Sequence, residues 1–309
     1  MQERSLLEVF EGLTNGDYEM LVRYLEAGGD PDARDPYGHT LLHLAVHEGL
    51  IDSLRLLLRS GANVEEEDDF GNTPMQVACM IGRREVANLL LEYGAKIDST
   101  SSTRTWTPLM LALNKSHEEV AEWLIKQGAN PNHVDQEQGW TPLLVACDQG
   151  MKELSIKLIQ QGGQVDAKVK SGDARGCSAI HLVSYYGTVE VIDELIRRGV
   201  DINLRPEGGG LGALHWAVYN GHMELLTYLL EKGADANLPA PGLYQSRNPL
   251  HFAVANSRPE MARLLLDYNA DPLYKDDEDQ SPLDIAFRRF KESGSHKDQY
   301  LLQLLEAYV

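Results

Sequence analysis

The sequence predicts an all-α solenoid of about nine stacked helix pairs, counting one capping pair at each end. Three observations lead to this fold class. A seven-residue motif occurs eight times along the 309 residues, successive copies lie 33–37 residues apart, and a helix-ending residue follows 21 positions after the second residue of all but the last copy. A fixed period of this length is the signature of stacked repeats, each of which buries its apolar face against its neighbours.

Each copy of the motif predicts the start of a first helix. The copies read HTLLHLA, NTPMQVA, WTPLMLA, WTPLLVA, CSAIHLV, LGALHWA, RNPLHFA and QSPLDIA. We call the second residue of each copy its anchor, and the anchors are Thr40, Thr73, Thr107, Thr141, Ser178, Gly212, Asn248 and Ser281. A Thr or Ser anchor can cap a helix, and the Pro that often follows suits the first helical turn.

The residue 21 positions after an anchor predicts the end of a second helix. These terminators are Gly61, Gly94, Gly128, Gly162, Gly199, Gly233 and Asn269. Glycine, and less often asparagine, adopts the left-handed conformation that ends helices. All variation in the period therefore falls in the finger that joins one terminator to the next anchor.

The two ends of the chain depart from the motif in the way that capping units do. Residues 1–34 predict an N-terminal capping pair, residues 35–270 seven full repeats, and residues 271–309 a C-terminal capping repeat, all within a single domain that spans 1–309. The C-terminal unit carries Arg288, Arg289 and Lys291 in its first helix, where inner repeats have small or apolar residues. One face of a terminal unit meets water, which explains this polarity.

The motif resembles that of the ankyrin-repeat family, whose repeat of about 33 residues carries a T-P-L-H-x-A signature. The resemblance covers nearly the whole chain in eight copies of fixed phase. It implies a β-turn finger and two antiparallel helices per repeat, stacked into a curved solenoid. It also implies that a partner contacts a concave face, which consists of the finger tips and the residues seven and eight positions after each anchor.

The net charge of −19, from 28 basic and 47 acidic residues, argues against a nucleic-acid or anionic-membrane partner. Residues 1–70 hold 16 of the acidic and only 5 of the basic residues. One finger contains five successive carboxylates, Glu65, Glu66, Glu67, Asp68 and Asp69. Two interpretations stay open: a solvated charge run on an exposed finger, or a patch that steers a basic region of a protein partner.

No catalytic, metal or cofactor site is predicted. His43, His181, His215 and His251 recur at one repeat position, so stacking separates them into different layers, and the family resemblance implies that they tie neighbouring turns together. The GGGLG stretch before Ala213 lacks the preceding strand of a dinucleotide loop. The three cysteines form no CxxC motif, which favours the reducing cytoplasm, although a leader removed earlier would leave no trace. The N-terminal segment is predicted to be an amphipathic helix and not a signal peptide.

Aromatic residues at partner-facing repeat positions are the candidate binding residues. They are Tyr37, Phe70, Trp106, Trp140, Tyr185, Tyr186, Tyr219 and Tyr244. Exposed Tyr and Trp side chains at equivalent positions would form a row of interface hot spots. The alternative for Trp106 and Trp140 is that they pack over their own fingers. Trp123 and Trp216 are expected in the core.

These observations favour a non-catalytic protein-protein interaction module that is monomeric alone. A narrower version is an inhibitor or immunity protein that occludes an enzyme or a toxin, because repeats fill the chain and its surface is acidic. The alternatives are a scaffold or adaptor, including a secreted bacterial effector that recruits a host protein, and, remotely, an enzyme that uses Cys177.

Overall fold

The computed structural model describes residues 2–100 and 105–309, with side chains from Leu6 onward within these ranges. Met1, the first residue of the expected capping unit, lies outside them. The described residues contain 18 α-helices, one short 3-10 helix and no strand, and the only β pairing among them is two isolated bridges. The prediction of an all-α solenoid of nine helix pairs is therefore confirmed.

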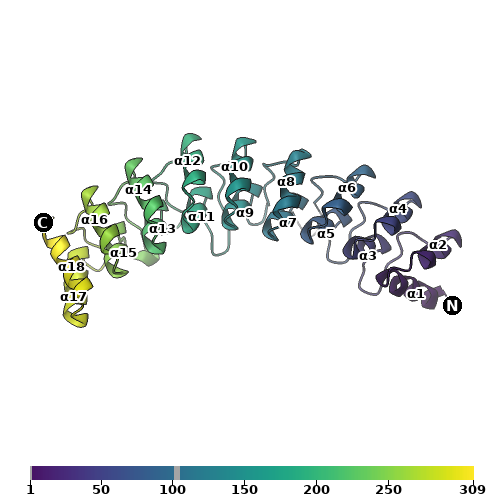
Figure 1. Ribbon diagram of the computed structural model, residues 1–309, viewed down its shortest axis with the longest axis horizontal. Helices are drawn as coiled ribbons and strands as arrows, with labels where there is room; N and C mark the ends of the chain where they lie inside the picture. The colour runs from purple at the N-terminus through teal and green to yellow at the C-terminus, as the bar shows by residue number, and fades with distance from the viewer. Residues whose placement is uncertain (1, 101–104) are drawn as a thin grey trace. The chain divides into compact units, whose positions relative to one another are not determined.

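The chain divides into two compact units, Met1–Glu137 and Gln138–Val309. In the first unit, the first helices of the pairs form one row and the second helices form another (Figure 1). Its helices are α1 (Gln2–Thr14), α2 (Tyr18–Glu26), α3 (Leu41–Glu48), α4 (Ile51–Arg59), α5 (Pro74–Met80), α6 (Arg84–Glu92), α7 (Pro108–Asn114) and α8 (Glu118–Lys126).

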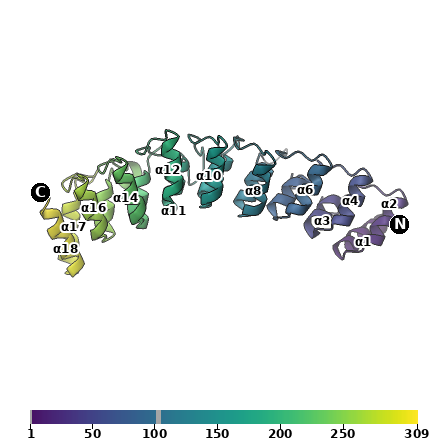
Figure 2. The same cartoon turned by 45° about the horizontal axis from the view of Figure 1, so that its top comes forward.

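The second unit repeats this two-row arrangement, with α10, α12, α14 and α16 above their partner helices in Figure 1, and Figure 2 shows the same helices after a 45° turn. Its helices are α9 (Pro142–Asp148), α10 (Lys152–Gln160), α11 (Ala179–Tyr186), α12 (Val189–Arg197), α13 (Ala213–Asn220), α14 (Met223–Glu231), α15 (Pro249–Ala255), α16 (Pro259–Asp267), α17 (Pro282–Ser293) and α18 (His296–Glu306), with the 3-10 helix η1 (Gly242–Tyr244) in a finger.

The helix boundaries follow the repeated residues. Thr73 caps α5 by accepting a hydrogen bond from the backbone N–H of Gln76, while the Gln76 side chain accepts one from the backbone N–H of Thr73. The side chains of Thr40, Thr107, Thr141, Asn248 and Ser281 likewise accept a bond from the backbone N–H three residues later. All seven terminators have positive φ, between 64° at Asn269 and 91° at Gly61. The predicted start and stop signals therefore set the length of the helical part of each repeat.

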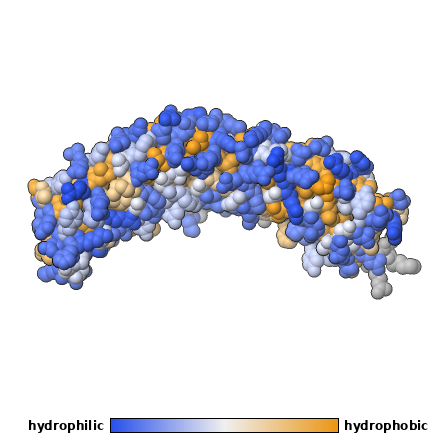
Figure 3. All heavy atoms as spheres, viewed as in Figure 1, coloured by the Kyte–Doolittle hydropathy of each residue, from blue (hydrophilic) through white to orange (hydrophobic). Residues whose placement is uncertain are grey.

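The core lies between the two helices of each pair and between neighbouring pairs. In α7, Leu109, Ala112 and Leu113 are fully buried, and Leu124 of α8 is buried with them. Burial of such side chains contributes about 2 kcal/mol each to folding. The face seen in Figure 3 is mostly hydrophilic, and its hydrophobic residues form separate patches. Most of the apolar content is thus used to hold repeats together.

In three fingers, an aspartate side chain accepts hydrogen bonds from backbone N–H groups of the same finger. Asp35, Asp68 and Asp276 each lie five positions before an anchor, and one carboxylate oxygen of each accepts hydrogen bonds from the backbone N–H groups two and four residues later. The donor–acceptor distances are 2.8–3.0 Å. Such aspartate turns stabilise tight loops. They hold these fingers in a fixed conformation beside the first helices.

Candidate functional site

Side-chain hydrogen bonds fix the C-terminal end of most first helices to the next repeat. The carbonyl oxygen of the residue seven positions after an anchor accepts a bond of 2.5–3.2 Å from a side chain of the following repeat. We call these bonds the carbonyl clamps. Their donors and acceptors are Arg83 and His47, His117 and Met80, Tyr186 and Asp148, His222 and Tyr185, Arg258 and Tyr219, and Arg289 and Ala255. The clamps hold the candidate partner-facing positions on rigid elements.

Six aromatic side chains of the second unit form a continuous series of ring contacts, which we call the aromatic ladder. In order, its members are Tyr186, Tyr185, Trp216, Tyr219, Phe252 and Tyr244. Successive ring centroids lie 5.2, 5.4, 5.9, 6.4 and 6.0 Å apart. Most of these pairs meet edge to face, an arrangement that the charge distribution of aromatic rings favours. The ladder therefore joins α11, α13, α15 and η1 along one surface.

The exposed part of the ladder consists mainly of tyrosines that the repeat positions predict. Tyr185, Tyr186 and Tyr219 are 50%, 44% and 46% exposed, and Tyr244 is half-buried. These tyrosines leave a large surface area available for contact. Each has only two side-chain torsion angles, so it loses little conformational entropy on binding. These four predicted residues are brought together by the fold.

Trp216 corrects one expectation. It is half-buried and lies between Tyr185 and Tyr219 instead of in the core, whereas Trp123 is buried as expected. Trp216 is three residues before Tyr219 on α13, and this spacing puts both rings on one helix face. Phe252 occupies the equivalent position on α15 and also joins the ladder. An aromatic residue four positions after an anchor is the sequence signal for both.

The remaining predicted aromatic residues lie apart from the ladder. Tyr37 and Phe70 are 72% and 59% exposed in the first unit, and the Phe70 ring lies 5.7 Å from the ring of His39. Trp106 and Trp140 are half-buried in their fingers. The carbonyl of Trp106 accepts a 2.9 Å hydrogen bond from Gln76, which ties that finger to α5. The two tryptophans thus offer less contact area than the tyrosines.

A cavity of about 550 Å³ opens beside Phe70 in the first unit. Its lining includes Phe70, Met80 and Ile81, together with His39 and the buried Asn72. Met80 and Ile81 are the residues seven and eight positions after Thr73, so this cavity lies at positions that the repeat pattern assigns to partner contact. It provides the first unit with a mostly apolar recess beside an exposed phenylalanine.

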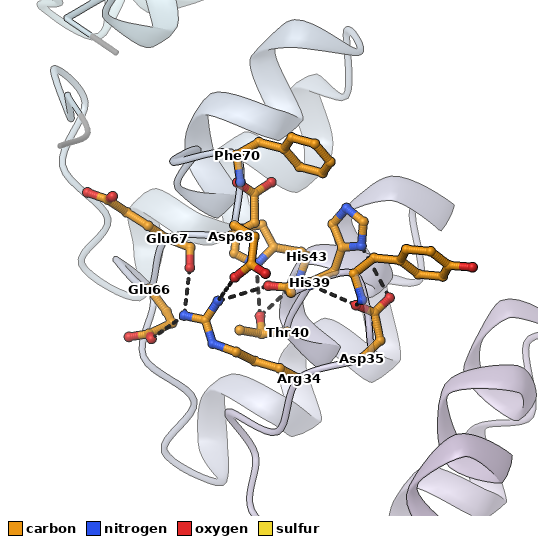
Figure 4. A network of polar contacts seen from close by, with 12 residues as sticks. Arg34, Asp35, His39, Thr40, His43, Glu66, Glu67, Asp68 and Phe70 are labelled. Carbon is orange, nitrogen blue, oxygen red and sulfur yellow. Dashed lines mark hydrogen bonds and ion pairs between the residues drawn. The ribbon is translucent and has the colours of Figure 1, made fainter. Parts of the chain in front are cut away.

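The acidic finger is held by Arg34 of the preceding repeat (Figure 4). The guanidinium donates to the Glu66 carboxylate at 2.6 Å and to the Glu67 carbonyl at 2.7 Å, and lies 3.4 Å from the Asp69 carboxylate. A Glu65 carboxylate oxygen accepts a 2.9 Å bond from the backbone N–H of Lys96. The run is therefore folded onto its neighbours and its charge is partly compensated.

Asp68 differs from the other carboxylates of that run because it stabilises the finger itself. Its side chain is buried and closes its own finger through the backbone N–H groups of Phe70 and Asn72. A partner that approaches the finger would meet the other four carboxylates and not this one. The position five residues before an anchor, shared with Asp35 and Asp276, is the signal that separates Asp68 from its neighbours.

The four repeated histidines connect adjacent repeats. Nε2 of His43, His181, His215 and His251 donates to the carbonyl oxygens of Asn72, Leu204, Arg247 and Gln280, respectively, at 2.9–3.2 Å. Burial lowers the pKa of all four rings, to about 4 for His181 and His215. They are neutral structural residues at pH 7, which agrees with their expected role.

A second cavity, of about 260 Å³, lies at one end of the aromatic ladder. Tyr185, Tyr186 and Trp216 line it together with Asp148, Asp173 and Cys177. Burial, with the nearby charge of Asp148, raises the pKa of the Cys177 thiol. The thiol is therefore protonated at pH 7, and a protonated thiol is a poor nucleophile.

Within the described ranges, no group of three His, Cys, Asp or Glu side chains is arranged to hold a metal ion. No helix in those ranges combines the length and the apolar character needed to cross a membrane. The ladder, the cavities beside Phe70 and Tyr185, and the acidic finger are the surface features that coincide with the predicted partner-facing positions.

Comparisons with known proteins agree with this architecture. A family model described as ankyrin repeats (3 copies) matches residues 10–101 and 98–170, and one described as ankyrin repeats (many copies) matches residues 180–230 and 214–266. The crystal structure of the human ASB11 ankyrin repeat domain is similar, with a TM-score of 0.62 and 27% identity over 75% of this chain and 98% of that chain. No curated protein matches. Ankyrin repeats are generally non-catalytic modules for protein–protein interaction, and this chain belongs to the ankyrin-repeat family.

Proposed function

We propose that this protein binds one protein partner through the aromatic ladder of its second unit. The observation that supports the proposal most directly is the ring series from Tyr186 to Tyr244, of which three tyrosines are close to half exposed. Rigid aromatic side chains lose little conformational entropy on binding and are enriched among interface hot spots. The carbonyl clamps on Tyr185 and Tyr219 hold the surface in place before the partner arrives.

The first unit contributes a second contact region. Tyr37 and Phe70 are exposed finger residues, and the recess next to Phe70 can accept an apolar side chain. The exposed carboxylates of the acidic finger favour a basic region on the partner. Trp106 and Trp140 support their fingers and contribute less contact area.

The biological role that we favour is inhibition of an enzyme or a toxin by occlusion of its working surface. The acidic surface supports this version, as it does for an immunity protein. The cytoplasm suits the three cysteines, Cys79, Cys147 and Cys177, which are all free. In the alternative role, as a scaffold, adaptor or secreted effector, the same ladder would recruit its partner without inhibiting it.

The test is capture of the partner by the wild-type chain and by a Tyr185→Ala/Tyr219→Ala variant. Partners captured by the wild type are identified by mass spectrometry, and the affinity of the purified partner is then measured for both chains. We expect the double variant to bind at least about 100-fold more weakly, because hot-spot truncations cost about 2 kcal/mol or more each. An assay of the partner's own activity then separates inhibition from recruitment.

Tyr268→Ala is the matched control, since Tyr268 is a 38% exposed tyrosine of the same unit that takes no part in the ladder. It should bind as the wild type does. Thermal unfolding of each variant checks that the fold is retained. Wild-type affinity in a folded Tyr185→Ala/Tyr219→Ala protein would remove the ladder from the interface.

A further inference from the structure

Three aromatic rings form the walls of the 260 Å³ cavity at the end of the ladder. The rings of Tyr185 and Tyr186 meet at 82°, and those of Tyr185 and Trp216 meet at 76°. Aromatic rings are the side chains that attract cations without carrying a charge, because the face of the ring is negative.

Two carboxylates line the same cavity, and both lack a counter-charge. Asp148 accepts a single side-chain hydrogen bond, of 3.3 Å, from the amide of its neighbour Gln149. Asp173 lies in the long finger before Ser178, is exposed, and has neither a hydrogen bond nor an ion pair with the rest of the described chain. The nearby Lys168 is already paired with Glu207 at 2.6 Å. The cavity thus combines aromatic walls with uncompensated negative charge.

The environment of Asp148 favours a positively charged neighbour. Burial raises the pKa of its carboxyl group, and the hydrogen bond from Gln149 offsets only part of this effect. An ionised carboxylate at this position has lost water without gaining a positive neighbour. A cation that entered the cavity would stabilise the ionised carboxylate of Asp148.

We propose that this cavity receives an arginine side chain of the protein partner. The inference rests on the proposed function, because the ladder and the cavity share Tyr185, Tyr186 and Trp216. A guanidinium group stacks on aromatic faces and pairs with carboxylates through a planar fork, and it is more weakly hydrated than an ammonium group. A neutral apolar side chain would leave both carboxylates desolvated, and an anionic one would be repelled. Arginine is the side chain that satisfies the rings and the charges together.

The test uses the full chain and three short peptides, acetyl-Gly-X-Gly-amide with X as arginine, citrulline or lysine. Citrulline has nearly the form of arginine but no charge. The indole N–H resonance of Trp216, identified by its loss in Trp216→Phe, reports binding directly. We expect a saturable shift with the arginine peptide and at least about tenfold weaker binding of the other two. Asp148→Asn and Asp173→Asn should each weaken arginine binding several-fold.

Glu231→Gln is the matched control, since it removes one exposed carboxylate of the same unit away from the cavity, and it should bind arginine as the wild type does. Equal binding of arginine and citrulline would overturn the proposal, as would tighter binding of lysine or unchanged binding in an Asp148→Asn/Asp173→Asn protein. If Tyr185→Ala/Tyr219→Ala abolishes partner capture while no arginine peptide binds, the proposed function stands and the arginine site does not.

Discussion

At the scale of single residues, the buried histidines make the fold sensitive to acid. The pKa of His181 and of His215 is lowered by burial from 6.5 to about 4 in the folded chain. The unfolded chain therefore takes up protons first as the pH falls below 6.5, and stability is lost progressively until the pH approaches 4. A shift of this size corresponds to about 3 kcal/mol for each histidine. We expect the midpoint of thermal unfolding to fall steeply between pH 7 and pH 4.5.

The contribution of one histidine can be measured with His215→Gln. The variant should be less stable than the wild type at pH 7, because the bond from Nε2 to the Arg247 carbonyl is disturbed, and its stability should depend less on pH. His296→Gln, at a solvent-exposed position of α18, should leave the pH dependence unchanged. If His215→Gln and the wild type lose stability in parallel, the acid sensitivity has another source.

At the scale of elements, the carbonyl clamps connect the packing of repeats to the binding surface. Arg258, at the start of α16, donates a 2.8 Å bond to the carbonyl of Tyr219, and its guanidinium covers Gly221, whose φ is +82°. Arg258→Met keeps the aliphatic contact and removes the bond. We expect a loss of about 1.5–3 kcal/mol in the free energy of unfolding, as for other hydrogen bonds to charged groups, together with weaker partner binding. Denaturant unfolding and a binding titration measure the two effects.

Arg197→Met provides the comparison for Arg258→Met. Arg197 is an exposed arginine of the same unit whose ion pairs, with Asp193 and Glu194, stay within α12. Such pairs contribute little, so the variant should lose less than about 0.5 kcal/mol and bind normally. Similar losses in both variants would mean that the clamp contributes no more than a surface ion pair.

The elements also show which features a single sequence can predict. Anchor caps and terminators are local signals, and for this reason the helix order, the nine pairs and the positive φ at Gly61 or Asn269 follow from the sequence. The predicted tyrosines 185, 186 and 219 follow from repeat positions in the same way. The expectation that Trp216 lies in the core is wrong, because its exposure depends on the packing of Tyr185 in the preceding repeat.

Contacts between repeats are the features that the pattern alone did not reveal. The clamp donors Arg83, His117, His222 and Arg258 all lie ten positions after an anchor, but only the folded chain shows which carbonyl they reach. The burial of Asp68 was hidden in a run that appears uniformly charged. The sequence thus predicts where side chains lie along a repeat, and the packing decides which of them remain available.

At the scale of the whole molecule, the acidic excess is unevenly divided. The first unit has 24 acidic and 11 basic residues, a net charge of −13, whereas the second has 23 and 17, a net charge of −6. The unit with the larger negative charge is not the unit that holds the ladder. Exposed charges act on the encounter rate, and buried aromatic contacts act on the lifetime of a complex. The two units should therefore affect different rate constants.

The final prediction separates these rate constants with Glu65→Gln/Asp69→Asn. The replacements remove two charges of the acidic finger but keep oxygen acceptors for Lys96 and Arg34, and they leave the buried Asp68 intact. We expect the association rate with a basic partner to fall about two- to fivefold at low salt, with a flatter salt dependence and an unchanged dissociation rate.

The matched control, Glu224→Gln/Glu231→Gln, removes the same charge from exposed positions of α14 and should slow association less. Tyr185→Ala should instead accelerate dissociation. Equal association rates for the two charge variants would make the acidic finger a solvated surface with no part in steering.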